Sequence, residues 1–214
     1  MKILLTSTGL SNNKIRDFFI SRIDNLKEKT AVVVAAGRTP EEQGYIEASK
    51  KELIDLGIKV TEANISEMDS FPEDDFDIYY VCGGNTFYIL DRMRKTGAYK
   101  ALAGAIRKGK FYIGVSAGSI VPCRNIRIAG VGADGDENEV GLSDLSGFRI
   151  LPFYVFPHYS DSNEAEVRDF KGRGDDEVIG LTNDQAIFVS DNECLIIGNK
   201  GGLNLGLKAG DLTS

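Results

Sequence analysis

Short apolar runs alternate with helix-forming segments along the first half of the chain. The run TAVVVAAG (residues 30–37) is apolar at consecutive positions, which is typical of a strand buried on both faces. In the segment that follows, Thr39 can cap a helix, Pro40 takes its first position and Gly57 ends it. Further strands are expected in residues 2–8, 58–65, 76–85 and 110–116, and a helical region over 86–109 should break near Gly97.

This alternation predicts an α/β fold. We expect three layers of the Rossmann-like or flavodoxin-like kind, with a mostly parallel central sheet and helices on both faces. Residues 148–159 read as another strand, and residues 178–198 as an antiparallel C-terminal strand pair joined by the turn SDNE. Between them, residues 125–146 are rich in Gly, Asp, Glu and Asn, and a long irregular loop of this kind is often functional.

Composition restricts the partners. The chain has 214 residues, 42% of them hydrophobic, which suits a single domain over residues 1–214. Its net charge is −7 and its basic residues do not cluster, so nucleic acid is an unsuitable partner. No apolar run is long enough for a membrane span or a signal peptide, so we expect a cytoplasmic protein that does not bind membranes. With one histidine and three dispersed cysteines, neither a metal nor an organic cofactor is expected.

Sites in such sheets lie beyond the carboxyl ends of the strands. Three turns are therefore candidates: GGN at residues 83–85, GVSAG at 114–118 and PHY at 157–159. The second turn matches G-x-S-x-G, the strand-to-helix elbow that exposes a nucleophilic serine, here Ser116, and directs the following N–H, here that of Ala117, toward an oxyanion. The alternative is an ordinary tight turn that needs small residues.

A nucleophilic serine needs a base and a group that orients the base. His158 is the one imidazole in the chain, and it follows a predicted strand, so it should emerge at the same sheet edge as Ser116. The acidic candidates between the two are numerous: Asp134, Asp136, Glu137, Glu139 and Asp144. The glycines of GGN can present backbone amides to an anion, and Asn85 can cap the helix that follows.

The four stretches GGNTF, GVSAGS, PHY and NDQAI, in this order, resemble the peptidase E family. These are aspartyl dipeptidases of the serine peptidase class, related in fold to class I glutamine amidotransferases. The resemblance implies hydrolysis of short peptides, dipeptides with an N-terminal aspartate above all. By matching position it implies Ser116 as the nucleophile, His158 as the base, and Gly84 and Ala117 as oxyanion donors.

The acid is where this sequence departs from the family pattern. Bacterial aspartyl dipeptidases carry TNDMP in the loop, whereas this chain has DGDENEVGL. Counting back from PHY places Asp136 on the family's aspartate, with Glu137, Asp134 and Glu139 as alternatives. Asn85 and Arg168 are the substrate-binding candidates, Arg168 because an arginine can grip an acidic side chain with two hydrogen bonds. The alternative for Arg168 is a surface pair with Glu164.

Other functions stay open at this point. A glutaminase-like amidotransferase needs a cysteine at the elbow, and Cys123 lies outside that turn. A non-catalytic binding protein of the same fold, or a peptidase with another N-terminal preference, would also fit. The expected partner is a small peptide substrate, and a homodimer is left as an open alternative.

Overall fold

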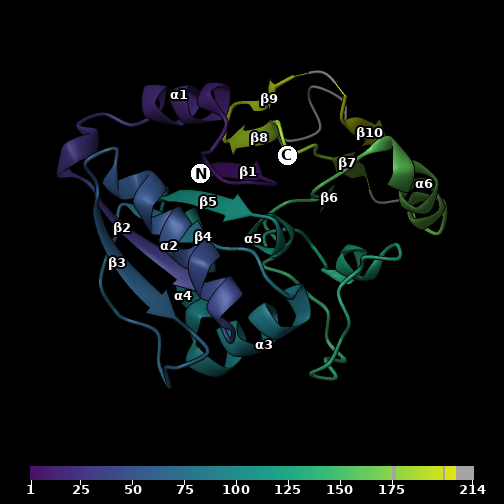
Figure 1. Cartoon of the computed structure of the whole chain (residues 1–214), viewed down its shortest axis with the longest axis horizontal. Coiled ribbons are helices and arrows are strands. Elements are labelled where there is room, and N and C mark those ends of the chain that lie inside the picture. Colours follow the sequence, from purple (N-terminus) through teal and green to yellow (C-terminus); the bar gives the residue numbers. More distant parts are fainter. Residues whose placement is uncertain (175–176, 200, 206–214) are drawn as a thin grey trace.

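A seven-stranded sheet forms the centre of the computed structural model, which describes residues 1–174, 177–199 and 201–205 (Figure 1). The strand order is β3-β2-β4-β5-β1-β8-β9. The first five are parallel, whereas β8 is antiparallel to β1 and β9 is antiparallel to β8. The bounds are β1 Lys2–Thr6, β2 Thr30–Ala35, β3 Lys59–Asn64, β4 Ile78–Val81, β5 Phe111–Val115, β8 Gln185–Ser190 and β9 Cys194–Gly198.

Helices cover both faces of this sheet. One core packs α1 (Asn13–Ser21) and α2 (Pro40–Ile54) on the face that includes Leu4 of β1. The other core packs α3 (Thr86–Thr96), α4 (Ala98–Arg107) and α5 (Ala117–Ile120) on the face that includes Ile3 and Leu5. Successive side chains of a strand point to opposite faces, so one apolar run supplies both cores. The predicted three-layer α/β architecture and its antiparallel C-terminal pair, β8 and β9, are confirmed.

Local signals set the helix ends. The Asn12 side chain accepts a hydrogen bond from the Lys14 amide at 2.9 Å and caps α1. Thr39 and Glu42 form a reciprocal capping box at the start of α2, directly before Pro40. Gly97, in the left-handed region at φ 83°, separates α3 from α4 where the sequence predicts a break.

A second, three-stranded sheet was not predicted. It has the order β10-β7-β6, with β6 Tyr154–Phe156, β7 Val178–Gly180 and β10 Leu203–Leu205. With α6 (Glu164–Gly172) it lies beyond the arrowheads of β1 and β5 (Figure 1). A strand was expected over residues 148–159, but only three of these residues, those of β6, pair in a sheet. Residues 178–180 were expected in the C-terminal strand pair, but they pair with β6 in the small sheet. The small sheet thus carries His158 to the carboxyl edge of the central sheet.

The long segment between α5 and β6 is irregular, as predicted, except for a short 3-10 helix, η2 (Arg127–Gly130). Two further short 3-10 helices are η1 (Leu26–Glu28) and η3 (Asp161–Asn163). Among the described residues, none of the helices combines the length and the hydropathy that crossing a bilayer would require.

Candidate active site

Ser116 lies in a strained turn between β5 and α5. Its φ of 52° and ψ of −114° are unusual for a residue with a side chain. The two glycines of the motif are required for steric reasons. A Cβ on Gly114 would overlap the Gly118 carbonyl, and a Cβ on Gly118 would overlap the Val81 carbonyl. The close packing of β4, β5 and α5 therefore holds the serine in the elbow conformation that the sequence predicts.

His158 contacts this serine. The distance from His158 Nε2 to Ser116 Oγ is 3.0 Å, within hydrogen-bond reach. The histidine also has a positive φ, 56°, and its amide donates to Ser7 Oγ at 3.0 Å. Ser7 Oγ in turn donates to the Leu181 carbonyl at 2.9 Å, which ties the end of β1 to the segment after β7. The structure thus brings together the two residues that the sequence analysis placed on separate turns.

The other imidazole nitrogen faces an amide. His158 Nδ1 lies 2.8 Å from Asn183 Oδ1. Because an amide oxygen only accepts hydrogen bonds, Nδ1 carries the proton and Nε2 presents its lone pair to the Ser116 hydroxyl. Thr8 Oγ1 donates to the Asn183 carbonyl at 2.9 Å and fixes the turn between β7 and β8. This role of Asn183, which opens the NDQAI stretch, was not predicted, because an acid was expected beside the histidine.

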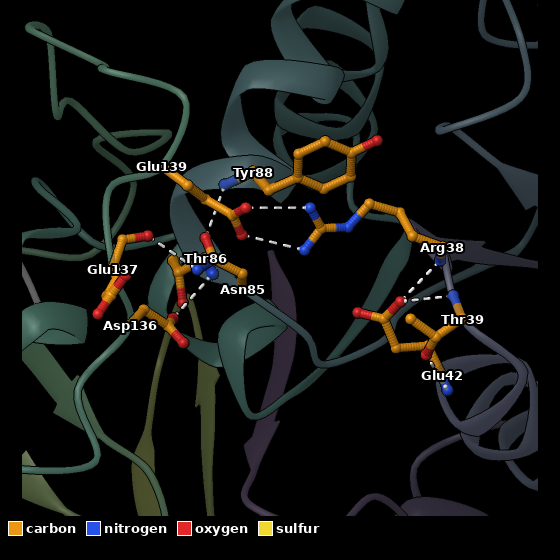
Figure 2. A network of polar contacts seen from close by, with 9 residues as sticks. All are labelled: Arg38, Thr39, Glu42, Asn85, Thr86, Tyr88, Asp136, Glu137 and Glu139. Atoms are coloured by element: carbon orange, nitrogen blue, oxygen red, sulfur yellow. Dashed lines mark hydrogen bonds and ion pairs between the residues drawn. The ribbon is translucent and has the colours of Figure 1, made fainter.

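Asp136 does not lie on His158. Its Oδ2 accepts a hydrogen bond from the Thr86 amide at 2.8 Å, at the start of α3 (Figure 2). A carboxylate at a helix N-terminus satisfies a free N–H and interacts favourably with the helix dipole. The prediction that Asp136 orients the base is therefore corrected: Asn183 takes that position, and Asp136 anchors the loop to α3.

Two other acids of the loop, Glu139 and Asp144, are paired with arginines. Arg38 binds Glu139 with two hydrogen bonds, of 3.1 and 3.3 Å, and its guanidinium stacks 4.1 Å from the centroid of the Tyr88 ring (Figure 2). The hydrogen bond from Arg38 lowers the pKa of Glu139. Asp144 pairs with Arg94 at 3.2 Å. None of the described acids of this loop has a hydrogen bond to His158.

The two substrate-binding candidates have protein partners. Asn85 Oδ1 accepts from the Tyr88 amide at 2.9 Å, and its Nδ2 donates to the Glu137 carbonyl at 2.9 Å (Figure 2). Asn85 is thus a helix cap that also fastens the loop. Arg168 pairs with Glu164 at 2.6 Å on the surface of α6 and lines neither cavity beside Ser116. The surface pair considered as its alternative is the arrangement found.

Backbone amides beside Ser116 are available for an oxyanion. A Cβ on Gly83 would lie 3.1 Å from Ser116 Cβ, so the GGN turn abuts the nucleophile. Gly84 has φ 132°, which favours glycine. Ala117 is the first residue of α5, where amides have no partner within the helix. In the part of the chain that the structure describes, neither the Gly84 nor the Ala117 amide donates a hydrogen bond.

Two cavities meet at this centre. The first, of about 520 Å³, extends toward α2 and the ends of β1, β2 and β4. The second, of about 440 Å³, lies under the loop at 128–136 and beside α6. Ser116, His158 and Gly84 line both. A peptide bond held at Ser116 can therefore place one residue in each cavity.

Other chemistries find less support. Burial raises the pKa of the Cys123 thiol to about 12, so this cysteine is not a thiolate nucleophile of the amidotransferase kind. Among the described residues, no group of three or more His, Cys, Asp and Glu side chains is placed to hold a metal ion.

Comparison with known proteins identifies the family of this chain. The model of peptidase family S51 matches residues 3–197. An uncharacterised peptidase of Listeria monocytogenes is 32% identical over 80% of this chain and 87% of its own length, and a peptidase E of Nostoc is 26% identical over 89% and 79%. The crystal structure of a protein of L. monocytogenes EGD-e described as a candidate peptidase E superposes with a TM-score of 0.78 at 29% identity, over 93% of this chain and 98% of that one. The chain belongs to peptidase family S51 and is a serine peptidase.

Proposed function

We propose that this peptidase hydrolyses short peptides by acyl transfer through Ser116. The Ser116 oxygen attacks the carbonyl carbon of the scissile peptide bond while its proton moves to His158 Nε2. The tetrahedral intermediate collapses as the C–N bond breaks, and Nε2 returns the proton to the leaving amine. Water then attacks the acyl-enzyme, with His158 again as base, and releases the acid and the free serine.

The observation that carries this proposal is the 3.0 Å contact between His158 Nε2 and Ser116 Oγ at a residue with φ 52°. A strained backbone at a serine beside an imidazole indicates function, since an ordinary turn gains nothing from the strain. The G-x-S-x-G elbow and the family membership support the same chemistry.

Asn183 acts as a positioning residue in this scheme. Its Oδ1 selects the tautomer of His158 that leaves Nε2 free to accept a proton. A neutral amide orients the ring but stabilises the imidazolium less than a carboxylate would, an arrangement with a precedent in Cys-His-Asn peptidases.

The amides of Gly84 and Ala117 are the proposed oxyanion donors. Both are free of other hydrogen bonds within the described ranges, and both belong to turns that abut Ser116. Preorganised backbone donors of this kind stabilise the charge that develops on the carbonyl oxygen in the transition state.

The N-terminal aspartate preference stays a prediction from the family resemblance. An acidic side chain would need a compensating cation, and no lysine or arginine is among the residues that line the two cavities. We therefore restrict the proposal to short peptides, with dipeptides as the first class to assay.

The test is hydrolysis of a dipeptide panel by the wild type and by Ser116→Ala and His158→Ala, with circular dichroism to confirm folding. Cleavage by the wild type and a loss of several orders of magnitude in both variants is expected. Equal cleavage by Ser116→Ala would refute the mechanism. No step uses a metal, so activity should persist in a chelator.

A further inference from the structure

The first cavity leads from the catalytic pair to a carboxylate. Ser116, His158 and Gly84 stand at one end. Ala36, Ile46 and Val115 are among the apolar residues of its walls. Tyr80, which is 1% exposed, and Glu52 on α2 also line it. Its volume of about 520 Å³ is in the range of sites that hold a small ligand.

Only one of the two carboxylate oxygens of Glu52 has hydrogen-bond partners among the described residues. Its Oε2 accepts two hydrogen bonds, from the Tyr80 hydroxyl at 2.7 Å and from the Leu10 amide at 3.0 Å. No hydrogen bond reaches Oε1 from the described residues. Burial raises the pKa of this carboxyl, and the hydrogen bonds from Leu10 and Tyr80 and the charge of Arg16 offset the effect only in part. A partly buried carboxylate with a free oxygen favours a hydrogen-bond donor, above all a charged one.

Carboxylates are the charged side chains that line the two cavities. Glu42 and Glu52 line the first cavity, whereas Asp134, Asp136 and Glu166 line the second. Neither lining includes a lysine or an arginine. An acidic substrate side chain would be repelled by carboxylates in either cavity, whereas a basic side chain would be attracted by them.

We propose that the first cavity binds the basic side chain of a lysine or arginine next to the scissile bond, with Glu52 Oε1 as acceptor for its charged head. This inference rests on the proposed peptidase function and specifies its substrate class. Glu42, the other carboxylate of this cavity, belongs to the capping box of α2, where its Oε2 accepts hydrogen bonds from the amides of Arg38 and Thr39 at 2.7 and 2.9 Å.

The depth of the cavity selects a long side chain. Tyr80, the partner of Glu52, precedes Gly83 by three residues, so in an extended segment its Cα lies roughly 10 Å, at about 3.3 Å per residue, from that of Gly83, which abuts Ser116. The α-ammonium of a dipeptide sits two bonds from the scissile carbonyl carbon and cannot span this distance. The unbranched stem of lysine or arginine can, and it would contact the apolar walls on the way.

The experiment compares kcat/KM for Lys-Ala, Met-Ala and Asp-Ala, and for Ala-Lys, Ala-Met and Ala-Asp, because either flanking residue can occupy the cavity. Methionine is the unbranched neutral reference. Glu52→Gln is the test variant, since its amide oxygen can still accept from Tyr80 and Leu10 while a donor replaces Oε1. Glu47→Gln is the matched control, on the same helix but outside the cavity and paired with Lys50 at the surface.

In one of the two series the wild type should cleave the lysine peptide at least about tenfold better than the methionine peptide, with the aspartate peptide slowest. Glu52→Gln should remove this preference and leave the methionine peptide within about threefold, whereas Glu47→Gln should keep it. An absent lysine preference in both series, or one that survives in Glu52→Gln, would overturn the inference.

Labelling of Ser116 by a small neutral fluorophosphonate separates this inference from the proposed function. If Ser116 does not react, the mechanism fails and the specificity inference falls with it. If Ser116 reacts but no dipeptide is cleaved, the inference is tested by protection of Ser116 from the label. In the wild type, n-butylammonium should slow labelling more than n-butanol does. In Glu52→Gln, the two additives should slow labelling equally. Equal protection of the wild type by the two additives would overturn the inference alone.

Discussion

His158 Nδ1 and Asn183 Oδ1 lie 2.8 Å apart, so an amide and not a carboxylate orients the imidazole that contacts Ser116. Asn183→Ala should lower kcat about tenfold to hundredfold, because the ring loses its fixed tautomer and direction while Ser116, His158 and the amides remain. Asn183→Asp should keep activity, since its carboxylate accepts the same hydrogen bond. Steady-state kinetics on the best dipeptide measures both effects. An unchanged kcat in Asn183→Ala would show that the contact with His158 does not contribute to catalysis.

Asp136→Asn should have little effect on activity. The asparagine oxygen can still accept from the Thr86 amide, so the anchor of the loop on α3 is kept. A decrease in kcat of less than about fivefold is expected, against about 10⁴-fold where an orienting aspartate of a serine protease is made asparagine. A loss of that larger size would return Asp136 to the catalytic centre.

The backbone conformation at Ser116 is expected to lower the stability of the folded protein. With φ 52° and ψ −114°, a residue with a Cβ is strained there and glycine is not. Ser116→Gly should exceed Ser116→Ala in free energy of unfolding by about 1 kcal/mol, and both should be inactive. Urea denaturation supplies the comparison. If Ser116→Ala proves the more stable variant, the elbow is not strained.

Glu52 predicts a stability that depends on pH. Burial raises the pKa of its carboxyl in the folded protein above the unfolded value, so between the two pKa values the folded state holds more protons. The contribution of Glu52 to stability is thus full below the unfolded pKa and is lost as the pH rises through the folded one. Glu52→Gln does not titrate, so its stability relative to the wild type should rise from acidic to neutral pH. Denaturation at several pH values tests this, and a constant difference would contradict the raised pKa.

The central sheet and the elbow could be predicted from the sequence because their signals are local. The apolar run before Ala35, the capping box at Thr39 and Gly114 and Gly118 around Ser116 each act within a few residues. His158 was expected near Ser116 because strands of one parallel sheet end at a common edge, but it follows β6 of the small sheet, and that sheet brings it to the site. The outcome is the 3.0 Å contact with Ser116.

The small sheet and the partner of His158 could not be predicted in the same way. Strands of three residues, such as Tyr154–Phe156, are too short to show a period. Asn183 reaches His158 only because β7 joins the small sheet while β8 returns to the central one. Asp136 was chosen by counting along a loop, and its actual partner, the Thr86 amide, is 50 residues away in sequence. Predictions of one domain over residues 1–214 and of a cytoplasmic location stay predictions.

The most direct measurement is covalent labelling of Ser116 by a fluorophosphonate in the wild type, His158→Ala and Ser116→Ala, read by intact-protein mass spectrometry and peptide mapping. The account predicts one label on Ser116 in the wild type, strongly slowed labelling in His158→Ala and none in Ser116→Ala. A wild type that stays unlabelled, or a label at the same rate in His158→Ala, would contradict the claim that His158 activates Ser116.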